Sequence, residues 1–273
     1  MEKVLLFLET EMATPQPWGW FHWIWIFITI GTIACLVTTK HSEKKLKILL
    51  LTYGIIAAVL ELTKQLIWTF DYNALLDIFT KDYQWYAAPF QLCTTPMYVS
   101  IMCGFMKPGK ERQTLLSYMA FVTILGGLAT ILMPSSCFTS MIQVNVHTMW
   151  LHCGGLIVSV YLLASGVVKA EKDNLLRALC LFTFMVAAAL IMNVVIYNSG
   201  ILDGDTFNMF YISPYFISSL PVFDIIQQNV PYAVFLAIYI IALSLGACLV
   251  YGVTRIAYKM PSLLAKSKFL HNN

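Results

Sequence analysis

The sequence predicts an all-α polytopic membrane protein: a bundle of seven transmembrane helices with the N-terminus outside and the C-terminus in the cytoplasm. Only 11% of its 273 residues are charged and 59% are hydrophobic, whereas soluble domains carry about 25% charged residues. The apolar runs are about 20 residues long, as a membrane-spanning helix requires, and lack the short alternating pattern of a β-barrel. The basic residues are also confined to alternate connections, which indicates the orientation.

The elements follow in order along the chain. Residues 1–17 hold one short apolar patch between acidic residues, so we expect an outer interfacial segment rather than a signal peptide. Residues 18–257 form the predicted transmembrane domain, and each of its seven apolar runs is long enough to cross the hydrocarbon core. The runs cover residues 18–39, 46–69, 86–106, 115–133, 146–168, 175–197 and 231–257.

Basic residues lie mainly in the first, third and fifth connections and in the tail, residues 258–273. Because cytoplasmic loops are enriched in Lys and Arg, we expect this side to be cytoplasmic and the protein to reside in the cell membrane. Acidic residues dominate the opposite side. The basic residues that set the orientation are Lys40, Lys44, Lys45, Lys47, Lys107, Lys110, Arg112, Lys169, Lys172, Arg177, Arg255, Lys259, Lys266 and Lys268.

The connection from residue 198 to 230 is too apolar for a solvated loop, and it contains Pro214 and Pro221. Non-helical backbone at membrane depth is tolerated where it is buried in protein or lines a cavity. We therefore expect a lid-like or re-entrant segment between the last two helices on the outer side.

Polar residues inside the runs point to a site. Glu61, Lys64 and Gln65 are three and four residues apart, which places them on one face of the second helix. Their charges would either form an ion pair between helices or line a site, since intramembrane ionisable groups are costly and are functional candidates. In the third run, Pro89 and Pro96 should loosen the helix around the two polar residues Gln91 and Cys93.

The fifth run adds His147 and His152, and the sixth adds Asn193. Once the orientation is assigned, these residues and those of the second and third runs all fall in the outer half of the membrane. Polar residues that only join helices would be expected at all depths of the membrane and not in one half of it. The sequence thus predicts one polar pocket that opens toward the outer leaflet.

Three stretches carry a resemblance to a known family: "APFQLC" (88–93), "HTMWLHCGGLIVSVYLL" (147–163), and the region from Asn193 through "VFDIIQQNVPYAV". They resemble the YwaF-like bacterial membrane proteins, a family distantly similar to the transmembrane protein 164 family of phospholipid acyltransferases. The resemblance extends from the third to the seventh run and implies a seven-helix bundle.

The resemblance also implies lipid acyl chemistry, with Cys93 as nucleophile and His152 as base. Such a pair is chemically coherent, since a buried thiol needs a nearby base to form its thiolate. Gln91, Asn193 or Lys64 could stabilise the oxyanion. The sequence departs from the pattern in two ways: Gln91 replaces the motif histidine, and the cysteine of the animal relatives aligns nearer Phe90.

Three function classes remain open from the residues alone. The first is a Cys/His acyltransferase or lipid hydrolase. The second is a lipid- or solute-binding or transport protein that uses Glu61 and Lys64, and the third is a subunit of a larger membrane complex. We expect membrane lipid as a partner, no nucleic-acid binding, no cofactor and no metal site, because no metal-ligand or phosphate-loop spacing occurs.

Overall fold

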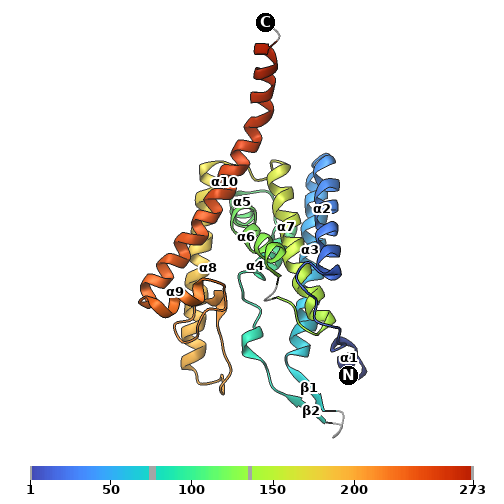
Figure 1. The fold of residues 1–273 in the computed structure, drawn as a ribbon, viewed down its shortest axis with the longest axis vertical. Helices are drawn as coiled ribbons and strands as arrows, with labels where there is room; N and C mark the ends of the chain where they lie inside the picture. The colour runs from blue at the N-terminus through green and yellow to red at the C-terminus, as the bar shows by residue number, and fades with distance from the viewer. Residues whose placement is uncertain (1, 74–77, 135–136, 272–273) are drawn as a thin grey trace.

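The computed structural model describes residues 2–73, 78–134 and 137–271, which form a helical bundle with one small hairpin (Figure 1). Within these residues, six helices are long and apolar enough to cross a membrane. They are α2 (Trp20–Thr38), α3 (Glu43–Ile67), the Lys110–Leu132 rod, α7 (Ile142–Ala164), α8 (Lys172–Asn198) and most of α10 (Tyr232–His271). The predicted class, a multi-pass helical membrane protein, is confirmed.

The count of seven spanning helices is not supported, because the predicted third span, residues 86–106, is broken. It starts with a 3₁₀ turn, η1 (Trp85–Ala87), and only α4 (Thr95–Phe105) is α-helical. The 11 residues of α4 rise about 16 Å, roughly half the thickness of the hydrocarbon core. Pro89 and Pro96 explain the break, since proline lacks an amide hydrogen and disfavours helix at the residue before it.

The Lys110–Leu132 rod lies in the centre of the bundle. It consists of α5 (Lys110–Tyr118), the π-helical turn η2 (Met119–Thr123) and α6 (Ile124–Leu132). The rod contacts α7 and α8, while α3 packs against α4 and α7. Every residue of η2 is buried, so this turn forms part of the packed interior.

Helices α2, α8 and α10 lie at the periphery and carry large apolar side chains on their outer faces (Figure 1). Phe27, Phe184 and Leu249 are 66%, 66% and 68% exposed, respectively. A surface of this kind is unfavourable in water and suits contact with lipid.

The end of the bundle away from the C-terminus carries several short elements (Figure 1). Its elements are α1 (Glu2–Leu8), the antiparallel pair β1 (Phe70–Asn73) and β2 (Ile78–Lys81), η4 (Met209–Tyr211) and α9 (Phe223–Asn229). The hairpin was not anticipated from the sequence. The connection between α8 and α10, which contains η4 and α9, packs on the bundle, where Met209, Phe210 and Ile212 are buried.

Candidate functional site

Helix α3 presents three polar side chains on one face near its C-terminal end, as their spacing predicts. The Glu61 carboxylate lies 2.8 Å from the Lys64 ammonium, and Gln65 Nε2 donates to Glu61 Oε1 at 2.7 Å. Glu61 is only 4% exposed. A buried charge without a partner is strongly unfavourable. The contacts with the lysine and the amide therefore stabilise this carboxylate inside the bundle.

Helix α7 adds His147 to the same group. The Nε2 of His147 lies 2.8 Å from Glu61 Oε2, and the histidine is 3% exposed. Lys64 and Gln65 thus contact one oxygen of the carboxylate, whereas His147, from a different helix, lies against the other oxygen without making a hydrogen bond to it. We call Glu61, Lys64, Gln65 and His147 the Glu61 cluster.

Two further residues complete the surroundings of this cluster, and the sequence did not single them out. Tyr83 donates its hydroxyl hydrogen to Gln65 Oε1 at 2.8 Å. Gln143 donates through Nε2 to the Leu60 carbonyl at 2.8 Å and to the Thr63 hydroxyl. Gln143 precedes His147 by one helical turn, and this spacing could have indicated that the two share a helix face. Tyr83 lies in a connection between helices, where no helical spacing points to its contact with Gln65.

Tyr83 lies outside the spanning helices. Burial raises the pKa of its phenol, and the negative charges of Glu61 and Asp205 raise it further. The phenol therefore stays protonated at neutral pH and remains a hydrogen-bond donor to Gln65.

Cys93 lies in the irregular stretch just before α4 and is half-buried. The hydroxyl of Thr94 shapes this stretch: it accepts from the amide of Gln91 at 3.0 Å and contacts the Pro89 carbonyl at 3.2 Å. The structure thus places Cys93 at the break between η1 and α4.

His152 faces a different helix. Its Nδ1 lies 3.2 Å from the Gly126 carbonyl of α6, and a carbonyl can only accept, so Nδ1 carries the hydrogen and Nε2 of the neutral ring keeps its lone pair. Among the described residues, no hydrogen bond joins His152 to Cys93. The histidine that the structure brings to the Glu61 cluster is His147.

Gln91 and Asn193 hold the connection between α8 and α10. Gln91 Nε2 donates to the Asn208 carbonyl, and Gln91 Oε1 accepts from the Phe210 amide, both at 2.9 Å. Asn193 makes the same pair of contacts with Met209, at 3.0 and 2.7 Å. Both amide side chains are thus occupied by backbone groups, and they anchor η4 rather than joining the Glu61 cluster.

These observations define a class: a polytopic membrane protein with a lipid-facing helical exterior and a buried ionic cluster at one end of the bundle. A family model, that of the TMEM164 family, matches residues 17–251. Because this match spans most of the chain, the protein belongs to the TMEM164 family. Neither a search of curated proteins nor a search of solved structures finds a match.

The predicted likeness to the transmembrane protein 164 family is thereby confirmed, while the likeness to the YwaF-like bacterial proteins stays a prediction.

Proposed function

We propose that this protein is a membrane-embedded enzyme that transfers acyl groups from phospholipid esters, with Cys93 as the nucleophile and His152 as the base. The observation that carries the proposal is the position of Cys93: a half-buried thiol at the proline break in the third segment, between η1 and α4. A buried thiol needs a base within reach to form its thiolate, and that is the role proposed for His152.

His152 is the better candidate for the base because of its hydrogen bonding. Its Nδ1 hydrogen points to the Gly126 carbonyl, which leaves Nε2 free to take a proton. The Nε2 of His147 instead faces the Glu61 carboxylate at 2.8 Å, so this nitrogen is not available to a thiol. The Gly126 carbonyl has the role of the group that orients the base in other nucleophilic sites.

The proposed reaction has two steps. Nε2 of His152 takes the thiol proton, the thiolate forms a bond to the ester carbonyl carbon, and the carbon–oxygen bond breaks, releasing a lysophospholipid that receives the proton. The resulting acyl-cysteine is then attacked by the hydroxyl of an acceptor lipid, or by water in a hydrolase. His152 removes the acceptor's proton and returns it to the departing Cys93 sulfur.

The Glu61 cluster supports this reaction electrostatically. The Lys64 ammonium would stabilise the negative charge that develops on the carbonyl oxygen, and Glu61 holds that lysine in place with His147 and Gln65 behind it. Gln91 and Asn193 would keep the α8–α10 connection closed over the site, which limits access of water.

We further propose that the site acts on lipid of the outer leaflet of the cell membrane, with the N-terminus outside. The concentration of basic residues in alternate connections supports this orientation.

The test is to trap the acyl-cysteine. Because Cys35, Cys180 and Cys248 are exposed to the lipid phase, these three are first replaced by alanine to remove background thiols. The purified protein is incubated with a phospholipid that carries an alkyne-tagged acyl chain. A hydroxylamine-sensitive tag on the peptide that contains Cys93 is the expected result.

Two variants in the same background sharpen the result. Cys93→Ser should abolish the hydroxylamine-sensitive thioester, and His152→Gln should reduce its rate of formation by about 100-fold or more, the range for a general base. The matched control is Cys137→Ser, which also removes a half-buried cysteine and should leave the tag in place. A tag that survives in Cys93→Ser would contradict the proposal.

A second function, binding or transport of a lipid or a small solute, is favoured by one observation. Glu61 and His147 form a buried carboxylate–imidazole contact, an arrangement typical of proton relays in transporters. In that case Cys93→Ser would retain full activity in a liposome uptake or lipid-transfer assay, whereas Glu61→Gln would lose it.

A further inference from the structure

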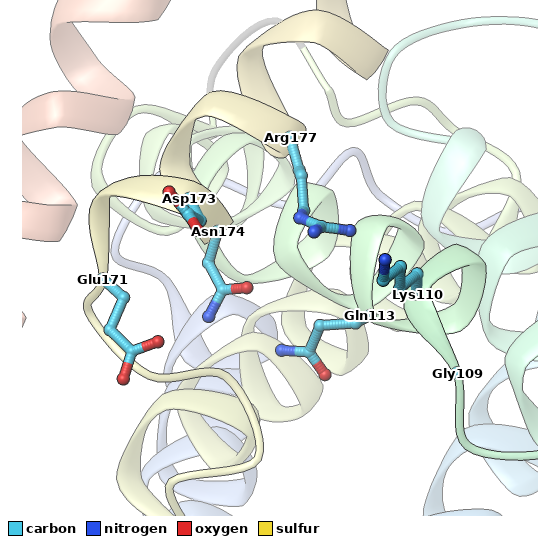
Figure 2. A pocket seen from close by; sticks show the side chains of 7 residues that line it. All are labelled: Gly109, Lys110, Gln113, Glu171, Asp173, Asn174 and Arg177. Carbon is cyan, nitrogen blue, oxygen red and sulfur yellow. The ribbon is translucent and has the colours of Figure 1, made fainter.

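The N-terminal ends of α5 and α8 lie at the other end of the bundle from the C-terminal end of α3, which carries the Glu61 cluster (Figure 1). A shallow, open pocket lined by charged side chains, which we call the cavity, lies between these two helix ends (Figure 2). Its volume is about 420 Å³. The polar side chains that line it are Lys110, Gln113, Glu171, Asp173, Asn174 and Arg177.

The charges in this cavity are sorted by sign. Figure 2 shows Lys110 and Arg177 on one side, Glu171 and Asp173 on the other, and the two amide side chains between them. Within the described residues, none of these four groups forms an ion pair. Two cations and two anions thus face one cavity without neutralising each other.

The amide side chains are oriented by the backbone. Gln113 Nε2 donates to the Val167 carbonyl at 3.2 Å, and Asn174 Nδ2 donates to the Lys169 carbonyl at 3.0 Å. Asn174 is also buried, at 8% exposure. Each amide nitrogen thus uses one of its two hydrogens, and the amide oxygens make no hydrogen bond within the described residues.

Two helix ends add to the cationic character. The residues that precede α5 and α8, Gly109 and Glu171, make no side-chain capping bond, so the first amide groups of both helices lack a side-chain acceptor. Helix N-termini favour anions, and Arg and Lys are the usual partners of phosphate oxygens. The opposite side of the cavity carries the carboxylates of Glu171 and Asp173, whose negative charge attracts an ammonium group, including a quaternary one that has no hydrogen to donate.

We propose that this cavity binds a zwitterionic group that carries a phosphate and an ammonium, the chemistry of a zwitterionic phospholipid head group. The phosphate would contact Lys110 and Arg177, and the ammonium would contact Glu171 and Asp173. None of these residues takes part in the proposed acyl transfer, so the site is independent of that function.

The position of the cavity favours a membrane lipid as the source of this group. It lies at the ends of two membrane-spanning helices, where head groups reside. Leu176, next to Arg177, is 59% exposed, and Phe184 two turns further along α8 is 66% exposed. These apolar side chains provide a surface along which the acyl chains could lie.

The test is native mass spectrometry of the full-length protein in detergent, titrated with dihexanoyl-phosphatidylcholine, dihexanoyl-phosphatidylglycerol or free phosphocholine. We expect the zwitterionic lipid to bind best. The double variant Lys110→Gln/Arg177→Gln should weaken its binding at least tenfold, about 1.4 kcal/mol. The matched control Lys172→Gln removes an exposed lysine of the same helix turn that does not line the cavity, and it should bind as the wild type does.

A second double variant tests the acidic side. Glu171→Gln/Asp173→Asn should remove the preference for phosphatidylcholine over phosphatidylglycerol. An unchanged preference, or equal weakening by Lys172→Gln, would overturn the proposal, since general surface charge would then explain the binding. If phosphocholine binds as tightly as the short-chain lipid, the acyl chains add nothing to binding. That result would contradict a membrane lipid as the ligand and would identify a soluble zwitterion instead.

Discussion

The two charged regions of this protein differ in how their charges are satisfied. In the Glu61 cluster, the carboxylate is buried and contacts a lysine, a histidine and an amide. In the cavity between α5 and α8, four charged groups face open space and form no ion pair within the described residues. The first arrangement fixes the relative position of α3 and α7, whereas the second leaves its charges available to a ligand. Substitutions should therefore affect stability in the first region and binding in the second.

The largest effect is expected for Glu61→Gln. Removing this charge leaves the Lys64 ammonium without a counter-ion in the bundle, and loss of one partner of a buried pair costs about 3–5 kcal/mol. The free energy of unfolding should fall by that amount in an SDS titration followed by circular dichroism. The control is Glu111→Gln, an exposed acid of α5, and an equal loss in the control would show that Glu61 has no special role.

The double variant Glu61→Gln/Lys64→Gln sharpens this test. It removes both charges, so no unpaired ion remains, and it should recover part of the stability that Glu61→Gln loses. A double variant less stable than the single one would mean that the ammonium is held by other groups.

A smaller loss is expected for Asn193→Leu. The change leaves the buried amide and carbonyl of Met209 without their partners, which should lower the free energy of unfolding by about 1–3 kcal/mol. Hydrogen exchange should also increase at residues 208–211. Asn229→Leu, which affects an exposed side chain bonded within α9, should leave exchange in that stretch unchanged.

A loss of similar size is expected for Gly127→Ala in α6. An added Cβ would lie 2.8 Å from the His152 carbonyl oxygen and 2.9 Å from Leu156, so α6 and α7 must separate. Overpacking of this kind costs about 1–3 kcal/mol. In Gly31→Ala, nothing lies within 4 Å of the new Cβ, and thermal unfolding should be unchanged or slightly delayed because alanine favours helix.

The smallest effect is expected for Arg177→Gln. Its side chain makes no ion pair in the described structure, so the free energy of unfolding should stay within about 0.5 kcal/mol of the wild type. A loss as large as that of Glu61→Gln in the same SDS titration would remove the distinction between the two regions.

Local parts of the site were predictable because they depend on one helix. The spacing of Glu61, Lys64 and Gln65 sufficed to place them on one face, as the structure shows. The ion pair forms within α3, however, and not between two helices as one interpretation of the sequence had it. The two prolines of the third segment likewise predicted a loosened helix. They did not reveal that only Thr95–Phe105 of the predicted span would be α-helical. The length of a break caused by proline depends on the packing around it.

Contacts between distant segments were not predictable from periodicity. Gln91 was singled out as a polar residue of the third segment, but its partners lie at Asn208 and Phe210, more than a hundred residues away. The choice between His147 and His152 as the neighbour of Glu61 is of the same kind. It depends on how α7 is rotated against α3, which periodicity alone does not determine.

The π-helical turn η2 determines which face of α6 reaches α7. A π-helical turn holds one residue more than an α-helical turn, and each residue of an α-helix advances the helix by about 100°. Because η2 absorbs one extra residue within a single turn, deleting one residue between Met119 and Thr123 would leave Gly126 and Gly127 facing α7. If the same residues all adopted regular α-helix instead, the two glycines would rotate by about 100° and the carbonyl that faces His152 would move away with them. The backbone conformation of one turn thus decides whether His152 meets its partner, and no side chain need change for that contact to be lost.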